Sequence, residues 1–223
     1  LPLTVLRIDE ETRYLVLEMG SRGPGHIQEL CTIARPDVAL VLNVGSAHVG
    51  EFGSVENTAR AKAELIEALE PQGVAVLNAD DPYVCAMAER TQAPIRWVGS
   101  GTSADVQVID VVLDDLARPH VTLRIDDETQ ELTLALHGEH QAINAAAAAA
   151  AATAAGMSRD QVFTALRSVR PQSRWRMEVT ATADSTTVVN DAYNANPESM
   201  TAALRALVAM GRGKQTWAVL GEM

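Results

Sequence analysis

Two residues at the ends of predicted strands have side chains suited to hold a divalent metal ion. Glu18 closes the apolar run at residues 12–19, and His48 follows the apolar run at residues 37–44. Open α/β sheets place their sites at the carboxyl ends of parallel strands, which meet at one edge of the sheet. A carboxylate and an imidazole that meet there can bind a divalent metal ion. The alternative is that both side chains are hydrogen-bonded structural residues, as isolated Glu and His residues at strand ends more often are.

Two glycine-rich segments resemble phosphate-binding loops, but neither fits the required pattern. In GRGKQT at residues 211–216, a Walker loop would need glycine at Val208 and Ser or Thr at Gln215. That segment also precedes a predicted strand, whereas a phosphate loop follows one. The glycines of GSRGPG at residues 20–25 do not have the G-x-G-x-x-G spacing. We therefore predict no phosphate-binding motif within this sequence.

The elements that must position these residues alternate between short apolar runs and amphipathic helices. This alternation predicts an α/β fold with a mostly parallel sheet flanked by helices. The expected strands cover residues 12–19, 37–44, 73–78 and 95–100, and the expected helices cover residues 26–34, 55–69 and 81–90.

A different pattern follows, in which three alternating runs are separated by turn residues. These runs, at residues 106–113, 120–125 and 131–136, predict a small antiparallel meander. Helices are expected again at residues 140–155 and 159–169, with Gly156 as the cap between them. Because Ala145–Ala152 is a run of alanine, we expect the first of these helices to pack closely against a neighbour.

The last part of the chain predicts the start of a second α/β unit. After a linker at residues 170–176, strands are expected at residues 177–183, 186–192 and 216–222, and a helix at residues 197–210. We expect the chain to be incomplete at both ends, because it begins at Leu1 rather than Met and ends inside the second unit.

Composition excludes several classes of protein. The chain has 18 basic and 29 acidic residues, a net charge of −11 and no basic run, so we exclude nucleic acid as a partner. It has no apolar run long enough to cross a bilayer and no signal-peptide start, which predicts a cytoplasmic protein without membrane insertion. We expect Cys31 and Cys85 to be reduced, buried thiols rather than a disulfide.

Eight segments of the sequence, taken in order and spacing, resemble the Mur ligase family. They are EMGSRGPGHI, NVGSAHVGEFGS, ARAKAELIEAL, LNADDP, GEHQAIN, SRWRME, NDAYNANPESM and VLGEM. The resemblance implies two domains. Residues 1–171 would be the family's central ATPase domain without its first strand and phosphate loop, and residues 172–223 would be the start of the Rossmann-like C-terminal domain. The first, second and seventh segments resemble the family member that joins D-alanyl-D-alanine to UDP-N-acetylmuramoyl-tripeptide.

The resemblance implies an ATP-dependent amide ligase of peptidoglycan precursor synthesis. ATP phosphorylates the terminal carboxylate of the tripeptide, and the amine of D-alanyl-D-alanine then attacks the acyl phosphate. Two magnesium ions and small-molecule substrates are implied, with a monomeric full-length enzyme. We expect this piece alone to be inactive, to bind MgATP weakly and to self-associate through exposed sheet edges. The alternatives are another Mur-type ligase, folylpolyglutamate synthase, or a non-catalytic scaffold with the same fold.

The resemblance also assigns the metal ligands. Glu18 matches the family's acidic magnesium ligand, and His48 matches a ligand of the second magnesium ion. Lys62 matches a lysine that the family carbamylates, which turns an ammonium into a carboxylate-like anion able to bind the metal. Without the resemblance, Lys62 reads as one of the solvated lysines common on helix surfaces.

The remaining functional residues are expected around the nucleotide. His140 and Asn144 match the segment that the family uses near the adenine, although Asn144 could instead start a helix. Arg176 matches an arginine near the γ-phosphate, with Arg174 as its rival. Asp191 matches a carboxylate that contacts the ribose.

Three residues that follow Asp191 match the segment that faces the substrates in this family member. They are Tyr193, Asn194 and Asn196. Because Asn-Ala-Asn-Pro is rich in turn-forming residues, the same segment could simply be a turn, with Pro197 at the start of the next helix. One residue can serve both purposes, so both interpretations remain open.

Overall fold

The computed structural model describes residues 1–45 and 53–222. By their internal contacts they form two compact units, Leu1–Arg96 and Trp97–Met223, and each is described by itself below. The division falls inside a strand, so that strand begins in the first unit and ends in the second.

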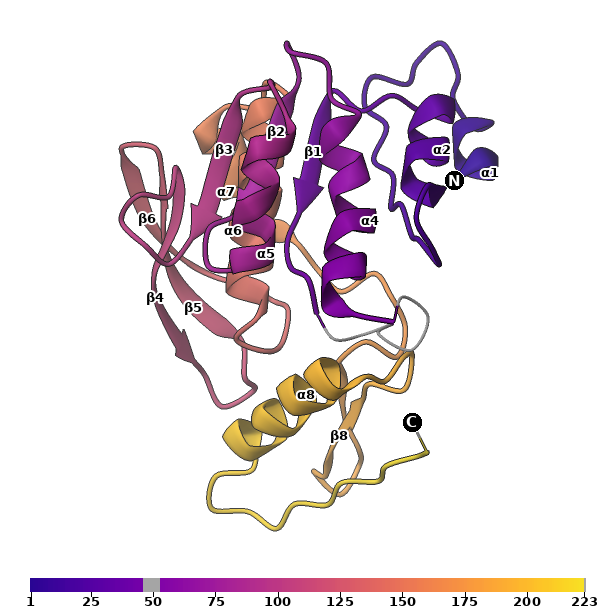
Figure 1. Cartoon of the computed structure of the whole chain (residues 1–223). Coiled ribbons are helices and arrows are strands. Elements are labelled where there is room, and N and C mark those ends of the chain that lie inside the picture. The colour runs from indigo at the N-terminus through magenta and orange to yellow at the C-terminus, as the bar shows by residue number, and fades with distance from the viewer. Residues whose placement is uncertain (46–52, 223) are drawn as a thin grey trace. The chain divides into compact units, whose positions relative to one another are not determined.

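Six strands form one sheet in the order in which they occur along the chain (Figure 1). They are β1 (Val38–Val41), β2 (Val74–Asn78), β3 (Ile95–Gly99), β4 (Val106–Leu113), β5 (Pro119–Ile125) and β6 (Glu128–Thr133). β1 pairs with β2, and β3 with β4, in parallel, whereas β4, β5 and β6 form the antiparallel meander. The predicted fold class, an α/β sheet with an appended meander, is confirmed.

The first unit packs its longest helix against the parallel strands. Its helices are α1 (Pro2–Val5), α2 (His26–Ile33), α4 (Val55–Glu67) and α5 (Pro82–Cys85), with a 3-10 helix, η1 (Ala86–Arg90). α4 contacts α2 and β1, and its buried face carries Ala61 and Ile66. Val76 and Leu77 of β2 are fully buried as well, so β2 and α4 supply much of the core of this unit.

The second unit is built on the meander and two helices, α6 (Gln141–Ala154) and α7 (Arg159–Ser168). α6 packs against β4, β5 and α7, and Ala146, Ala149 and Ala150 are fully buried. Small side chains let the helix approach the sheet closely, which confirms the expected role of the alanine run. Gly156 follows α6 with φ 94°, a left-handed conformation that only glycine adopts without strain.

A two-stranded ribbon and a helix complete the second unit. β7 (Glu178–Ala181) pairs with β8 (Thr187–Asn190) in antiparallel, and α8 (Pro197–Met210) follows. Met177, Ala206 and Met210 pack with Ala117 in a small apolar cluster. The predicted strand pair and helix are confirmed here, with ends that differ by a few residues.

Two predicted strands are wrong. Residues 12–19 and 216–222 form no strand, although both segments are described and apolar. Most of their side chains are exposed: Val16 is 91 % exposed and Val219 is 97 % exposed. Apolar, β-branched composition favours a strand only where another strand takes up its backbone groups, and neither segment has such a partner among the described residues.

Smaller differences have local causes. The third meander strand begins at Glu128 rather than residue 131, because Ile125 and Glu128 pair directly across a two-residue hairpin loop. Asp126 supplies the positive φ, 55°, that this loop needs. The helix expected at residues 81–90 is α-helical only to Cys85 and continues as the 3-10 helix η1. α1 was not predicted.

The two cysteines are free thiols, as predicted, but only Cys31 is buried, while Cys85 is half-buried. Burial raises the pKa of the Cys31 thiol, and the Glu64 carboxylate raises it further. Burial also raises the pKa of Cys85, with the nearby Asp81 and Asp80 carboxylates adding to the effect.

These raised pKa values predict slow alkylation of both thiols. The thiolate is the nucleophile, so a higher pKa leaves less of it at a given pH. At pH 8 we expect iodoacetamide to modify both cysteines more slowly than glutathione, Cys31 last, and we expect the rates to keep rising above pH 9. Peptide mass spectrometry over time measures this, and a Cys31 rate equal to that of glutathione would contradict it.

Candidate functional site

Lys62 lies on α4 and reaches the end of β1. Ser54 starts α4, because its side chain accepts a hydrogen bond from the backbone N–H of Asn57. Two turns later, Lys62 Nζ donates a hydrogen bond to the carbonyl oxygen of Asn43, at 2.6 Å. Asn43 lies just after β1, so the Lys62 amino group stands at the carboxyl end of a parallel strand, where α/β folds place their sites.

The surroundings of Lys62 shift the pKa of its amino group. Burial lowers the pKa of Lys62, because the charged ammonium loses water contacts, and the Asp81 carboxylate partly opposes this shift. A surface lysine would show no such burial, so the interpretation of Lys62 as an ordinary solvated residue loses support. A neutral amine is the form that can act as a nucleophile.

The other two predicted metal ligands are placed less fully. Glu18 is exposed and lies in the segment that forms no strand, so its expected position at a strand end is wrong. His48 lies outside the described residues. Across the part of the chain that the structure describes, no three His, Cys, Asp or Glu side chains gather as a metal site would require.

The glycine-rich segment before α2 is closed by a carboxylate. Glu64 of α4 accepts hydrogen bonds from the backbone N–H groups of Gly25, at 2.6 Å, and Gln28, at 3.1 Å. These are the donors that a helix N-terminus would otherwise offer to an anion. The segment therefore joins α2 to α4, in agreement with the prediction that it is not a phosphate loop.

The side chain of Gln141 connects those of His140 and Asn144. Gln141 Nε2 lies 3.0 Å from His140 Nε2, and Asn144 Nδ2 donates to Gln141 Oε1 at 3.1 Å. α6 begins at Gln141 with His140 as its N-cap, so the alternative that Asn144 starts the helix is wrong. Gln141 thus links two predicted site residues into one polar row at the start of α6.

The ring of His140 lies beside Gly138, and the charge of the Asp191 carboxylate acts on it. Burial lowers the pKa of His140, and the Asp191 carboxylate opposes this shift. Gly138 has φ 101°, and a Cβ there would stand 2.6 Å from the His140 ring. The positive φ therefore favours glycine at this position, and a larger residue would displace the His140 ring.

Arg176 and Tyr193, predicted from separate segments, touch each other. The guanidinium carbon of Arg176 lies 4.2 Å from the centre of the Tyr193 ring, a cation–π contact. Two backbone contacts join the same segments: Tyr193 N–H donates to the Trp175 carbonyl at 3.0 Å, and Asp191 Oδ1 accepts from Met177 N–H at 2.8 Å. The structure therefore brings Arg176, Asp191 and Tyr193 together.

The turn that carries Arg176 has an unusual backbone. Trp175 has φ 62° and Met177 has φ 49°, conformations that are uncommon for residues other than glycine. The contacts of Asp191 and Tyr193 described above hold this turn in place. Backbone strain of this kind often occurs at functional sites. Arg174, the rival of Arg176, precedes the turn and is exposed.

Asn196 caps α8. Its side chain accepts from Ser199 N–H at 2.8 Å, and Ser199 Oγ accepts from Asn196 N–H at 3.0 Å, which together make a capping box. Pro197 occupies the first turn of the helix, as predicted, whereas Asn194 and Asn196 lie in irregular backbone before it rather than in a turn. Asn194 is exposed, and its side chain accepts from the next backbone N–H.

Two substitutions of Asn196 distinguish its role as a helix cap from a role in substrate binding. We expect Asn196→Ala to lower the free energy of unfolding by about 1 kcal/mol, because a helix N–H loses its acceptor. Asn196→Ser keeps a capping oxygen and should retain most of that stability. Urea unfolding of both variants tests this, and equal losses in the two would contradict the capping role.

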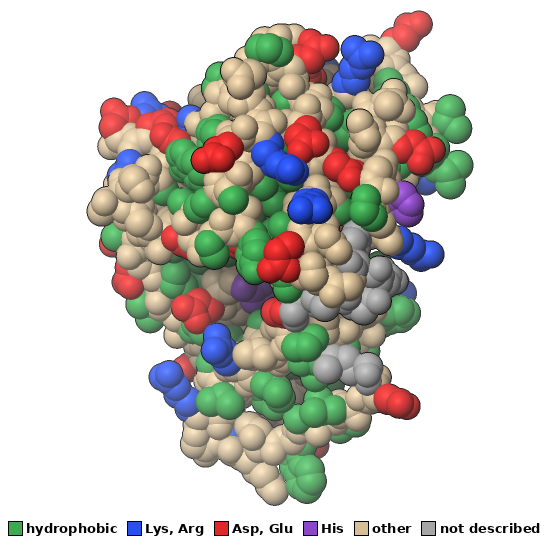
Figure 2. Space-filling model, viewed as in Figure 1, with side chains coloured by type: hydrophobic (Ala, Val, Ile, Leu, Met, Phe, Trp, Pro, Cys, Tyr) green, Lys and Arg blue, Asp and Glu red, His purple; other side chains and the backbone are tan. Residues whose placement is uncertain are grey.

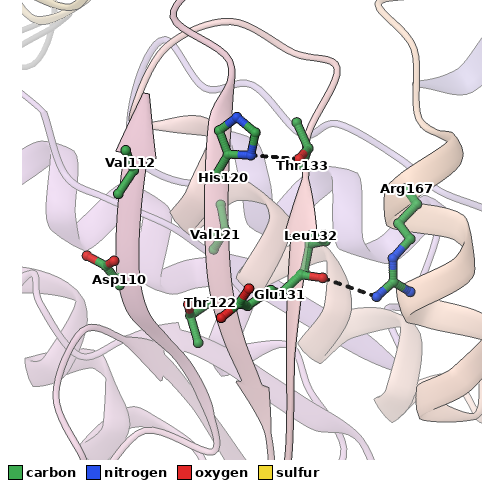
Figure 3. A pocket seen from close by; sticks show the side chains of 9 residues that line it. All are labelled: Asp110, Val112, His120, Val121, Thr122, Glu131, Leu132, Thr133 and Arg167. Carbon is green, nitrogen blue, oxygen red and sulfur yellow. Dashed lines mark hydrogen bonds between the residues drawn. The ribbon is translucent and has the colours of Figure 1, made fainter. Parts of the chain in front are cut away.

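A hollow elsewhere in the second unit is lined by β4, β5 and β6 of the meander and by Arg167 of α7 (Figure 3). It measures about 560 Å³. His120 Nδ1 and Thr133 Oγ1 lie 2.8 Å apart, and Arg167 donates to the Glu131 carbonyl at 3.2 Å. None of the residues predicted as site residues lines it.

Figure 2 shows acidic and basic side chains interspersed on the face in view.

Sequence reasoning gave no role to three polar residues, one in the second unit and two in the first, that contact predicted site residues or the backbone beside them. Gln141 links His140 to Asn144, and Asn78 and Asp81 bind the backbone just after β1. Asn78 and Asp81 lie in the LNADDP segment, one of the eight that resemble the Mur ligase family. The signal was present, because a polar residue at the end of a buried strand needs a partner.

No helix among the described residues is both long enough and apolar enough to span a membrane.

Comparison with known proteins gives two family matches along the chain. The Mur ligase middle domain matches residues 1–152, and the Mur ligase glutamate ligase domain matches residues 175–223. The UDP-N-acetylmuramoyl-tripeptide–D-alanyl-D-alanine ligase of Mycobacterium tuberculosis strain H37Rv is 49 % identical over 226 residues, which cover 100 % of this chain and 44 % of that protein.

Two solved structures are similar in fold and sequence. MurF from Acinetobacter baumannii superposes with a TM-score of 0.87 and 32 % identity over 93 % of this chain and 45 % of that one. MurF ligase from Thermotoga maritima, in complex with ADP, gives a TM-score of 0.76 and 29 % identity over 86 % and 44 % of the two chains. The chain spans less than half the length of these relatives. On the family matches and the shared fold, the chain belongs to the Mur ligase family.

Proposed function

We propose that the protein containing this chain is an ATP-dependent amide ligase that joins D-alanyl-D-alanine to UDP-N-acetylmuramoyl-tripeptide. The observation that carries this proposal is the 49 % identity along the whole chain to a ligase named for that reaction. ADP in a similar Mur ligase supports ATP as the nucleotide. We also propose a boundary between the two domains near residue 171, which lies between the two family matches.

The proposed reaction has two steps. The terminal carboxylate of the tripeptide attacks the γ-phosphorus of ATP, which gives an acyl phosphate and ADP. The amine of D-alanyl-D-alanine then attacks the acyl carbon, inorganic phosphate leaves, and the nitrogen loses a proton. Several negative oxygens approach one another in the first step, so positive charge must be placed among them.

Lys62 supports a metal-binding role only in a modified form. As an amine it is no ligand for Mg²⁺, which prefers oxygen ligands. If its nitrogen adds to CO2 and loses a proton, the side chain ends in a carbamate with two oxygens and a negative charge. The lowered pKa of Lys62 favours this addition, because the neutral amine is the reactive form. Glu18 and His48 are proposed as the further ligands. When bound, Mg²⁺ would neutralise charge on the phosphate oxygens.

The nucleotide and the substrates are assigned to residues of the second unit. We propose that His140 and Asn144 border the adenine and that Asp191 accepts from the ribose hydroxyls. The guanidinium of Arg176, held against the Tyr193 ring, is the cation proposed near the γ-phosphate. This contact favours Arg176 over Arg174, because a fixed cation costs less to place in the reacting geometry.

Residues 193–196 are proposed to face the substrates, and one of them also has a structural role. Tyr193 and Asn194 are exposed and free to face substrates, whereas Asn196 also caps α8. Partners are proposed to be small molecules, with a monomeric enzyme in the cytoplasm, where ATP is available.

One assay tests the proposal on the protein that the gene encodes. With ATP, Mg²⁺ and UDP-N-acetylmuramoyl-tripeptide, phosphate release should depend on D-alanyl-D-alanine, and mass spectrometry should detect the pentapeptide product. Supplying L-alanine, a diamino acid or glutamate as the amine should give no product. A preference for one of these amines would replace the proposal with another reaction of the family, and no turnover with any amine would favour a scaffold.

A further inference from the structure

The chain just after β1 is held by side chains from other parts of the first unit. Asn78, the last residue of β2, donates from Nδ2 to the Leu42 carbonyl at 2.9 Å. The next carbonyl, that of Asn43, accepts from Lys62 Nζ. Two consecutive carbonyl groups beyond the strand therefore have side-chain donors, and one of these donors is Lys62.

The third consecutive residue, Val44, is held by Asp81. Its buried backbone N–H donates to Asp81 Oδ2 at 2.8 Å. The other oxygen of the same carboxylate, Oδ1, accepts from the N–H groups of Tyr83, at 2.9 Å, and Val84, at 3.1 Å, and so caps α5. One carboxylate thus ties the start of α5 to the end of β1.

From this arrangement we infer that Asp81 and Asn78 are positioning residues for Lys62. They fix the backbone at residues 42–44, on which the Lys62 amino group rests, and so set where that group stands at the strand end. The inference rests on the proposed function of Lys62 and adds two residues that bind no substrate themselves. A displacement of about 1 Å in a reacting group can lower a rate about 100-fold, so such anchors matter for turnover.

Asp81 has two separable tasks, which allows a sharp experiment. In Asp81→Asn one carboxylate oxygen becomes an NH2 donor, so the side chain no longer accepts on both sides. In Asp81→Ser the hydroxyl still caps α5 but is too short to reach Val44. Ser158→Ala is the matched control, because it removes a helix cap of the same kind from α7, in the other unit.

Hydrogen exchange of the Val44 amide reports on its hydrogen bond to Asp81 independently of activity. We expect exchange to accelerate at least about tenfold in Asp81→Asn and Asp81→Ser, with Val84 still protected in Asp81→Ser, and no change at Val44 in Ser158→Ala. In the protein that the gene encodes, both Asp81 variants should lose about 10- to 100-fold in kcat, with KM for D-alanyl-D-alanine within about twofold.

The two proposals fail in different ways. Unchanged Val44 exchange in both Asp81 variants would overturn the inference, as would a wild-type kcat or a loss of kcat equal to that of Ser158→Ala. A wild-type protein that does not ligate D-alanyl-D-alanine, but whose Val44 exchange responds to Asp81→Asn, would overturn the proposed function and leave the anchor supported.

Discussion

Replacement of Lys62 with alanine is expected to lower kcat of the proposed ligase by about 10²- to 10³-fold, the loss typical when a preorganised electrostatic group is removed from an active site. The structural reason is the place of Lys62, half-buried at the carboxyl end of β1 with a lowered pKa. The effect should fall on kcat, because the proposed carbamate acts on charge that develops during phosphoryl transfer. Steady-state kinetics of the protein that the gene encodes measures this.

The chain offers a matched control, because Lys62 and Lys214 are its only lysines. Lys214 is exposed in the turn after α8, and Lys214→Ala should leave kcat unchanged. With ¹³C-labelled bicarbonate, a carbamate signal should appear in the NMR spectrum of this chain, persist in Lys214→Ala and disappear in Lys62→Ala. Full activity of Lys62→Ala would rule out the carbamylation proposal. An absent mass adduct would not, because the group is labile.

Replacement of Phe163 with alanine should have the largest effect on stability. Phe163 lies on α7, which packs on α6 and β6, and it is only 1 % exposed. Loss of a buried phenylalanine removes apolar contact and leaves a cavity, which typically costs about 3–5 kcal/mol. Urea unfolding followed by circular dichroism should show a lower midpoint with an unchanged slope.

The adjacent residue gives the comparison for this prediction. Thr164 is exposed on the same helix, so Thr164→Ala should change the free energy of unfolding by no more than about 0.5 kcal/mol. Equal midpoints for the two variants would mean that α7 contributes little to the cooperative core of the second unit.

Local pattern determined most of the elements. α4, α6, α7 and α8 lie where apolar periodicity and capping residues predicted them, because a helix satisfies its hydrogen bonds within its own segment. The order of sites along the chain was also readable, since eight segments in register identify a family more securely than any single motif.

Tertiary structure decided whatever depends on a distant partner. Residues 12–19 and 216–222 have the composition of strands, yet form none, because a strand needs a neighbour that sequence pattern does not supply. Other contacts likewise join residues far apart in sequence. Arg176 contacts the Tyr193 ring. Side chains of Asn78, Lys62 and Asp81 form hydrogen bonds with the backbone just after β1. Sequence alone determined which side chains are present at the strand and helix ends, and only folding decided which of them meet, because hydrogen bonds and charges act over a few ångströms of space.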